Sequence, residues 1–345
     1  SDYQILCEKQ QFNIENFIET DSKKISWTSG LKQNLSRNLN ITYNNKHLSN
    51  GIYRPFCKQW LYFNSDLNER CGQMQNIFPY KSIINKIICV TGRGATKDFS
   101  ALISNTLPDY EMISKGRCFP LHTYEKPKTD GLFNGTDEYV KHENIPNTIL
   151  KEFRKVYKKP KITKEDIFYY VYGILHSPEY KTRFKSDLKK MLPRIPFAKD
   201  FNTFSKAGRN LAQWHLNYET IEPYPLQEST GDFTKEPKEF YRVQKMKFAG
   251  KARQPDKTII IYNSNVILAG IPLEAYDYIV NGKSAIEWIM ERYQVTTDKK
   301  SGITNNPNDW SEDPRYIVDL VKRIVKVSIE TMKIVDRLPG LEEIN

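Results

Sequence analysis

Residues 163–176 read TKEDIFYYVYGILH, and this stretch marks a change from one kind of structure to another. Thr163, followed three residues later by Asp166, resembles the capping arrangement that begins a helix. Apolar residues then recur at three- and four-residue intervals: Ile167, Val171, Ile174 and Leu175. The stretch therefore predicts an amphipathic helix that buries one face.

Helical signals continue beyond this helix. Ser177 and Pro178 supply an N-cap and a proline at the first helical position, and Pro193 ends the pattern. Residues 204–218 predict another short helix, because their apolar residues keep a helical spacing.

The C-terminal third predicts a hairpin and then helices again. Two apolar runs flank a short polar turn, which indicates a β-hairpin near residues 258–270. Ser284 and Glu287 form a capping box for one helix. A long helix is expected to begin at Pro314 and to end near Leu338.

The chain before residue 150 has a different pattern. Short segments rich in aromatic and β-branched residues alternate with Gly and Pro, as in strands joined by turns. Clear examples are residues 60–63, 87–91 and 110–113. Residues 1–50 are polar and rich in Asn, so we expect a connecting region that follows an upstream domain.

Together the patterns predict an α+β fold with two lobes. A β-rich N-terminal lobe, residues 51–150, is followed by a mainly helical lobe, residues 151–345, which carries the β-hairpin near residues 258–270. Residues 1–50 form the linker.

Composition excludes several classes of protein. The 345 residues include 12% aromatics, far above what a disordered chain carries, and no apolar run approaches the roughly 18 residues that span a membrane. The five cysteines are odd in number and lack metal-ligand spacing, which argues against disulfides or zinc and favours reduced thiols in the cytoplasm. Because the sequence opens without Met or a signal peptide, we expect a fragment of a longer protein.

No motif for catalysis is found. The loop from Thr91 to Lys97 is not a P-loop, which needs Gly where Thr96 lies, and it is not a dinucleotide fingerprint, which needs Gly at Lys97. Two interpretations of this loop stay open: a tight turn at a strand end, or a basic loop that touches nucleic acid. His176 and His215 are expected to be structural. We therefore predict no catalytic residue, no metal ligand and no cofactor in this chain.

The chain is strongly basic, with 52 Lys and Arg against 41 Asp and Glu and a formal charge of +11. Basic residues interleave with aromatic ones in residues 53–60, 115–117, 151–164 and 242–253. Lys and Arg neutralise phosphates, and Arg, Asn and Gln read base edges, so this pattern favours nucleic-acid binding.

Several longer segments carry a family resemblance. They are Tyr53-Arg54-Pro55-Phe56, Trp60-Leu61-Tyr62-Phe63, Leu175-His176-Ser177-Pro178-Glu179-Tyr180, Leu192-Pro193-Arg194-Ile195-Pro196, Asn281-Gly282-Lys283-Ser284-Ala285-Ile286-Glu287-Trp288 and Asn306-Pro307-Asn308-Asp309-Trp310. From about residue 25 to residue 338, the chain resembles the C-terminal region of bacterial type ISP restriction–modification enzymes, often labelled predicted helicases.

The resemblance implies a longer polypeptide with a nuclease, a helicase-like translocase, an adenine-N6 DNA methyltransferase and a C-terminal target recognition domain. This chain would be the recognition domain, and residues 1–50 would link it to the methyltransferase. The full-length enzyme would use S-adenosylmethionine, ATP and Mg²⁺. The expected partners are double-stranded DNA and the upstream methyltransferase, with no membrane.

The resemblance names no base-reading residue, so DNA contacts are predicted from charge and loop position alone. In the β-rich lobe these are Arg54, Lys58, Arg93, Lys97, Lys115 and Arg117. Phosphate contacts from the helical lobe are predicted at Arg194, Arg209, Lys245 and Lys247. Two alternatives remain at this point: a protein-interaction or structural module with no base readout, and an autonomous nuclease or helicase.

Overall fold

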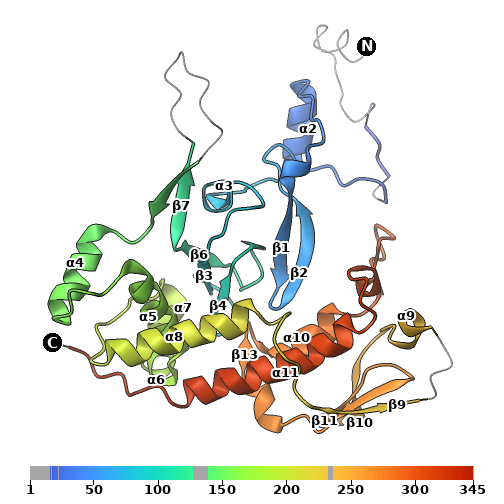
Figure 1. Cartoon of the computed structure of the whole chain (residues 1–345). Coiled ribbons are helices and arrows are strands. Elements are labelled where there is room, and N and C mark those ends of the chain that lie inside the picture. Colours follow the sequence, from blue (N-terminus) through green and yellow to red (C-terminus); the bar gives the residue numbers. More distant parts are fainter. Residues whose placement is uncertain (1–15, 17, 22, 127–138, 232–235, 345) are drawn as a thin grey trace.

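A computed structural model of the chain describes residues 16, 18–21, 23–126, 139–231 and 236–344 (Figure 1). Helices and several small sheets alternate along the chain, so the predicted mixture of α and β structure is confirmed. Two long helices, α8 (Phe201–Leu216) and α11 (Tyr316–Val335), lie across the lower part of the view in Figure 1. The small sheets lie around them.

Short strands dominate the first part of the chain. One sheet has the order β2-β1-β5, a second has the order β4-β3-β6, and β7 pairs with β8. Their bounds are β1 Leu48–Arg54, β2 Cys57–Tyr62, β3 Ile87–Val90, β4 Ala101–Ser104, β5 Leu107–Pro108, β6 Arg117–Pro120, β7 His122–Glu125 and β8 Val140–Glu143. Two helices, α2 (Ser29–Ser36) and α3 (Met74–Ile77), complete this part.

The helices after residue 146 include the predicted amphipathic helix of residues 163–176. They are α4 Asn147–Val156, α5 Lys164–His176, α6 Pro178–Arg183 and α7 Lys185–Lys190, followed by α8. The predicted cap of α5 is present, since Asp166 N donates to Thr163 Oγ1 at 3.1 Å and Thr163 N donates to Asp166 Oδ2 at 3.0 Å. The single helix expected after Ser177 is instead two, separated at Phe184.

The predicted hairpin is present but belongs to a larger sheet. Strands β11 (Gln254–Ile261) and β12 (Val266–Ala269) pair antiparallel, and β10 (Lys247–Lys251) and β9 (Gln227–Thr230) extend the sheet in the order β10-β11-β12-β9. The remaining α-helices and strands are α9 Pro237–Phe240, β13 Ile279–Val280, β14 Lys283–Ser284, α10 Ala285–Arg292, β15 Thr296–Thr297 and β16 Thr304–Asn305, and three short 3-10 helices lie at Asn45–His47, Leu273–Tyr276 and Pro307–Asp309. The capping box of α10 is formed by Ser284 and Glu287, as predicted.

Residues 110–113 differ from the prediction, because they form turns and no strand. The Asp109 carboxylate accepts the backbone N–H of Glu111 at 2.8 Å, and Met112 N donates to Asp109 O at 3.1 Å. Met112 and Ile113 are nonetheless buried. Their apolar side chains insert into the core from a turn, and this burial produced the strand-like pattern.

The buried apolar residues form two clusters, and each draws on both sides of residue 150. In the first, Ile52 and Leu107 join residues of α10 and α11. In the second, Ile88 and Ile103 join α5 and α8. The division into residues 1–50, 51–150 and 151–345 remains a prediction.

Helices α5 and α8 cross with their backbones in contact. A Cβ atom at Gly208 would lie 1.8 Å from the carbonyl oxygen of Tyr169, and one at Gly173 would lie 2.2 Å from that of Phe204. Neither distance is compatible with a side chain, so glycine at both positions lets the two helices approach closely.

A chain of buried hydrogen bonds ties this crossing to other elements. Ile103 N of β4 donates to the Tyr172 hydroxyl at 3.1 Å, and that hydroxyl lies 2.6 Å from His215 Nδ1. His215 Nε2 lies 2.9 Å from Thr331 Oγ1 of α11. Since burial holds the pKa of His215 well below its usual range, the ring is neutral. Tyr172 then donates to Nδ1, and the Nε2–H donates to Thr331.

The glycine contact gives a first prediction. Alanine is favoured over glycine inside a helix by about 1 kcal/mol, yet Gly208→Ala forces α5 and α8 apart. We expect a net loss on the order of 2 kcal/mol in the free energy of unfolding, measured in urea. Gly231→Ala is the control, because its Cβ would meet no atom closer than 3.9 Å. Equal stability of wild type and Gly208→Ala would disprove the close crossing.

The buried histidines give a pH prediction. Burial lowers the pKa of His176 to about 3, whereas an unfolded chain protonates His near pH 6.5. The free energy of unfolding is therefore highest above about pH 6.5 and decreases as pH falls toward 3. The burial of His176 alone lowers it by about 2 kcal/mol at pH 5. Urea unfolding at pH 7 and pH 5 measures this. The exposed-histidine variant His142→Gln should keep the same dependence, and equal stability at both pH values contradicts the account.

Candidate nucleic-acid interface

Two loops meet at one edge of the sheet β4-β3-β6. Residues 91–100 connect β3 to β4, and residues 109–116 precede β6, whose Arg117 pairs with Val90 of β3. Gly92 N donates to Ser114 O at 3.0 Å, and a Cβ atom at Gly92 would lie 1.9 Å from Lys115 O. Glycine at this position therefore lets the two loops lie backbone against backbone.

The hairpin β13–β14 joins the same edge through Asn281. The Asn281 side chain accepts a hydrogen bond from Ser114 N at 3.0 Å, and its own backbone N donates to Ser100 Oγ at 2.9 Å. Asn281 is buried and has a φ of 50°, a left-handed conformation that Asn tolerates better than most residues. The residue fixes a distant hairpin against both loops.

This convergence gathers five cations, which we name the basic cluster. Its members are Arg93, Lys97, Lys115, Arg117 and Lys283. Lys115 Nζ donates to Gly94 O at 2.8 Å, and the side chain of Lys97 packs beside Gly282. Four members were predicted from the sequence, while Lys283 was not, because only the Asn281 contacts bring it here.

Electrostatic repulsion is visible within the basic cluster. Burial lowers the pKa of Lys283, and the positive charges of Arg292 and then Lys97 lower it further. Lys283 is partly compensated by an ion pair with Glu291. Arg93, Lys97 and Arg117 are exposed, and the side chain of none of them forms a hydrogen bond or an ion pair among the residues that the structure describes. An anion placed here would relieve the repulsion.

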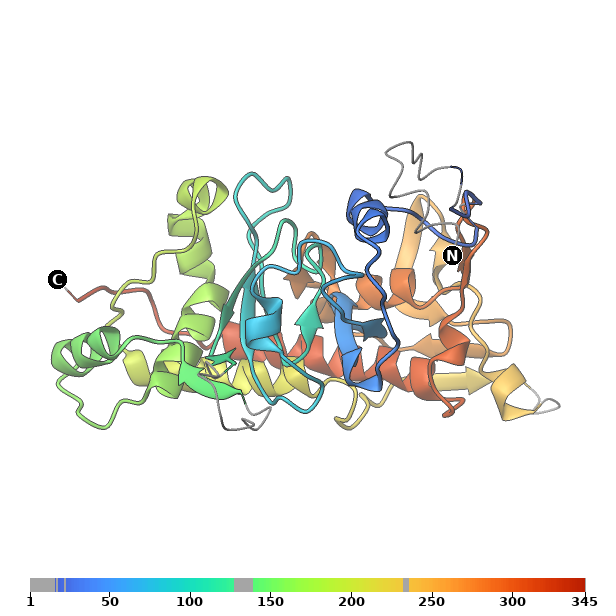
Figure 2. The same ribbon diagram turned by 90° about the horizontal axis from the view of Figure 1, so that it is seen from above.

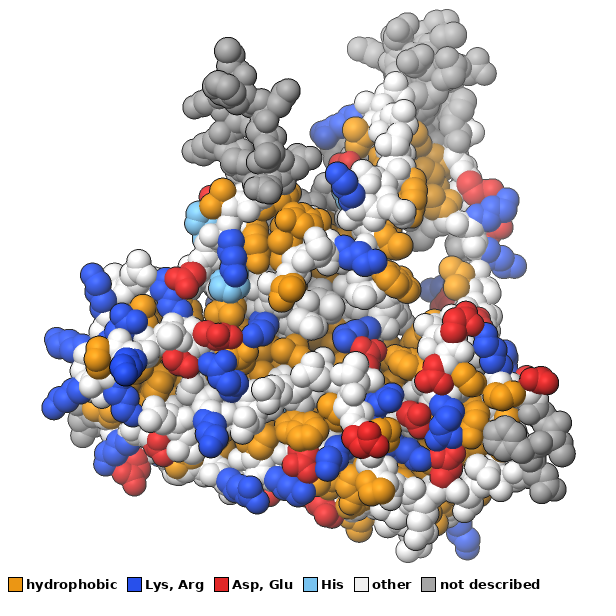
Figure 3. Space-filling model, in the orientation of Figure 1, with side chains coloured by type: hydrophobic (Ala, Val, Ile, Leu, Met, Phe, Trp, Pro, Cys, Tyr) orange, Lys and Arg blue, Asp and Glu red, His pale blue; other side chains and the backbone are white. Residues whose placement is uncertain are grey.

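Helix α7 extends the cluster on one side. Gly94 N donates to Lys189 O at 3.5 Å, and Lys189 Nζ lies 3.9 Å from the Asp98 carboxylate. In Figure 2 the teal loops of this part of the chain extend on the side away from α8 and α11. By contrast, Figure 3 shows Lys and Arg interspersed with Asp and Glu over the face formed by α8 and α11.

Two other predicted cations, Arg54 and Lys58, are already paired. Arg54 Nη1 lies 2.6 Å from Asp109 Oδ1, and its guanidinium stacks 4.0 Å from the Tyr53 ring centroid. Lys58 Nζ lies 2.6 Å from Glu219 Oε2. Both side chains are about four-fifths buried, at 20% and 23% exposure, so they hold the β1–β2 hairpin to its surroundings.

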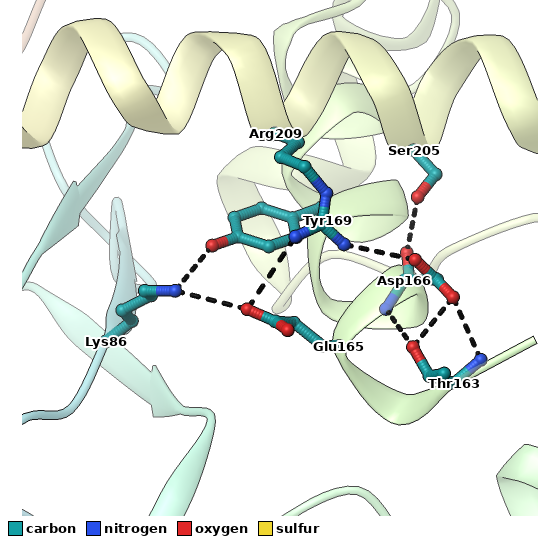
Figure 4. A network of polar contacts seen from close by, with 7 residues as sticks. All are labelled: Lys86, Thr163, Glu165, Asp166, Tyr169, Ser205 and Arg209. Carbon is teal, nitrogen blue, oxygen red and sulfur yellow. Dashed lines mark hydrogen bonds and ion pairs between the residues drawn. The ribbon is translucent and has the colours of Figure 1, made fainter.

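Arg209 lies in the polar network of Figure 4, at the contact of α5 and α8. Its guanidinium lies 3.1 Å from Asp166 Oδ1 and 4.3 Å from the centroid of the Tyr169 ring. Burial alone would raise the pKa of Asp166, but hydrogen bonds from Thr163 and the charge of Arg209 outweigh it and lower the pKa. On the other side of Tyr169, Lys86 donates to the Tyr169 hydroxyl at 2.7 Å.

The remaining predicted cations lie apart from this network. Lys245 and Lys247 are exposed and line a groove of about 430 Å³ with Arg242 and Asn265. Arg194 is exposed, and its backbone carbonyl accepts the Tyr180 hydroxyl at 2.9 Å. Within the described ranges, no hydrogen bond or ion pair joins the side chain of any of the three to the basic cluster.

Metal sites and membrane-spanning helices are two further features to consider in the residues that the structure describes. Across residues 16–344, outside the gaps given above, no group of three or more His, Cys, Asp and Glu side chains is arranged to hold a metal ion. In the same residues, no helix combines the length and the apolar character needed to cross a membrane.

Comparison with known proteins gives consistent matches. A model of the Type ISP C-terminal specificity domain matches residues 2–320. A search among curated proteins returned no match.

Among solved structures, the chain is similar to the ATP-dependent Type ISP restriction-modification enzyme LlaBIII bound to DNA, with 34% identity and a TM-score of 0.85. It is also similar to a nuclease-deletion mutant of the Type ISP enzyme LlaGI in complex with a DNA substrate mimic (35% identity, TM-score 0.81) and to a DrdV–DNA complex (28%, 0.83). Each match covers 99% of this chain but only 21%, 25% and 33% of those chains, respectively.

The contrast between paired and unpaired cations gives a stability prediction. Arg209→Ala removes an ion pair and a cation–π contact, so we expect a loss of about 1 kcal/mol in the free energy of unfolding. Arg93→Ala, which removes no partner among the described residues, should change it by less than about 0.5 kcal/mol. Urea unfolding compares the two variants. The reverse order of effects would contradict the structural role of Arg209.

Proposed function

Because the chain belongs to the family of Type ISP C-terminal specificity domains, we propose that it binds double-stranded DNA and reads a short asymmetric site through base edges. The observation that carries this proposal is the basic cluster, where exposed cations from two loops and the partly buried Lys283 from a third, distant segment are brought together. Its support from outside is that LlaBIII, LlaGI and DrdV, the similar structures, are all complexes with DNA or a mimic of it.

In this proposal, the cations differ in role. Arg93, Lys97, Lys115 and Arg117, joined by Lys283, hold phosphates and set the register of the duplex. Arg194, Lys245 and Lys247 add phosphate contacts farther out, because their side chains are exposed and have no ion-pair partner in the described chain.

Arg54, Lys58 and Arg209 are weaker candidates. Each would have to exchange a carboxylate at 2.6 to 3.1 Å for a phosphate, which gains little. Their proposed contribution to DNA binding is therefore chiefly indirect, through the surfaces they hold in place.

We further propose that this chain is the recognition part of a longer polypeptide in the cytoplasm. An upstream adenine-N6 methyltransferase would flip and modify an adenine that this domain positions, using S-adenosylmethionine. ATP and Mg²⁺ would serve the translocase and nuclease, in line with the ATP-dependence of LlaBIII. No catalytic residue, cofactor site or metal ligand is assigned to the present chain.

Salt dependence tests this function. We expect the logarithm of the association constant for duplex DNA, measured by fluorescence anisotropy, to fall linearly with the logarithm of salt concentration. Arg93→Ala combined with Arg117→Ala should weaken binding and lower the magnitude of the slope by about 2.

The control removes the same charge elsewhere. Lys199→Ala combined with Lys333→Ala takes two exposed, carboxylate-paired lysines from other parts of the surface. The proposal predicts a smaller change for this pair. No duplex binding at low salt would favour a protein-interaction or structural module, and equal effects of both double variants would remove the assignment of the basic cluster.

A further inference from the structure

The loop of residues 109–116 has a firmly held backbone. Asp109 N donates to Ile52 O at 2.9 Å, and Gly116 N donates to Tyr110 O at 2.9 Å. The Asp109 carboxylate is itself held by Arg54. Met112 and Ile113 are buried beneath the loop. The loop is therefore anchored both by its backbone hydrogen bonds and by its buried side chains.

Tyr110 is an exception to this order. Its side chain is 56% exposed, and in the described part of the chain its ring pairs with no other aromatic and its hydroxyl makes no hydrogen bond. Two other exposed aromatic rings have partners: Trp60 lies under the Lys81 ammonium at 4.8 Å, and Tyr43 stacks on Tyr62 at 5.4 Å. Tyr110 thus has a fixed backbone and an exposed ring with no aromatic partner among the described residues.

Tyr110 lies between two acidic residues, Asp109 and Glu111, and its backbone also lies near cations. The Tyr110–Gly116 hydrogen bond places its backbone beside Lys115 and Arg117, and Lys115 reaches across to the loop that carries Arg93. The Asp109 carboxylate is paired with Arg54, and the Glu111 carboxylate accepts Lys115 N at 3.4 Å. An aromatic ring among phosphate-binding cations is the arrangement by which proteins stack on nucleic-acid bases.

We propose that Tyr110 contacts a base directly, by stacking its ring on a base at an opened step of the duplex. The inference rests on the proposed function and deepens it, because it separates a base contact from the phosphate contacts. Bases inside a regular duplex are covered by their neighbours, so the ring needs a step that is already unstacked. Extrusion of a target adenine would create such a step.

A rigid loop lowers the free-energy cost of stacking the Tyr110 ring on a base. Stacking on an aromatic side chain is lost on alanine substitution, with an effect that corresponds to roughly 5- to 100-fold in affinity. Because the loop backbone is already ordered, only the two side-chain torsions of Tyr110 are fixed on binding. The ring, and not the hydroxyl, supplies the contact, so phenylalanine should replace tyrosine.

The test uses the chain and a duplex that it selects from a pool of random sequence, in versions that carry one mismatched base pair, and so an opened step, at each position of the selected site in turn. Tyr110→Ala should weaken binding to the selected duplex roughly 5- to 100-fold and leave binding to unselected duplex unchanged. Tyr110→Phe should retain the wild-type affinity for both. Tyr43→Ala is the matched control, an exposed tyrosine whose removal should leave selection unchanged.

The outcomes separate this inference from the proposed function. If the wild-type chain binds no duplex, the proposed function fails. If the wild type selects a sequence and Tyr110→Ala binds it equally well, only the role of Tyr110 fails. Equal weakening on selected and unselected duplex would also overturn it, since that result describes a phosphate contact. Circular dichroism checks that each variant is folded.

Discussion

The buried hydrogen-bond chain from Ile103 through Tyr172 and His215 to Thr331 holds four elements in one arrangement: β4, α5, α8 and α11. Every polar atom along it is removed from water, so each must find its partner inside the protein. Loss of one member would leave the others unsatisfied at a cost of about 1–3 kcal/mol each. The His215 ring is neutral and the Tyr172 hydroxyl already accepts from Ile103 N, so Tyr172 donates to Nδ1 and the Nε2–H donates to Thr331. The close crossing of α5 and α8 at Gly173 and Gly208 supplies the geometry that this chain needs.

The proposed binding surface depends on that arrangement. Strand β4 belongs to the sheet whose edge carries both basic loops, so the contact between Ile103 and Tyr172 orients the edge relative to the helices. From the opposite side, Asn281 brings the hairpin before α10 against the same loops. Within the basic cluster, Lys97 then repels Lys283. Binding of a phosphate would relieve this repulsion. Because the loops are already ordered, binding would carry no cost for ordering them.

Local signals in the sequence were sufficient to predict some of the helices and some of the cations in the basic cluster. The capping boxes at Thr163 and Ser284 act over three residues, so the starts of α5 and α10 could be predicted. Arg93 and Arg117 could be proposed because they flank strand ends in a basic chain. Contacts between distant residues could not be foreseen. The partner of Lys58 lies 161 residues away, and Asn281 reaches Ser114 over 167 residues. Lys283 was therefore missed, and charge alone could not distinguish the paired Arg209 from the unpaired Arg93.

In this proposal the loops around the basic cluster face the DNA, and the basic residues around α4 do not. Hydrogen–deuterium exchange with and without duplex tests it directly, because the amides of each segment report separately. The account predicts slower exchange on DNA binding in residues 91–100, 109–117 and 281–284. It predicts little change in the basic residues 151–161 around α4. Protection confined to residues 151–161, with the loops unchanged, would contradict it.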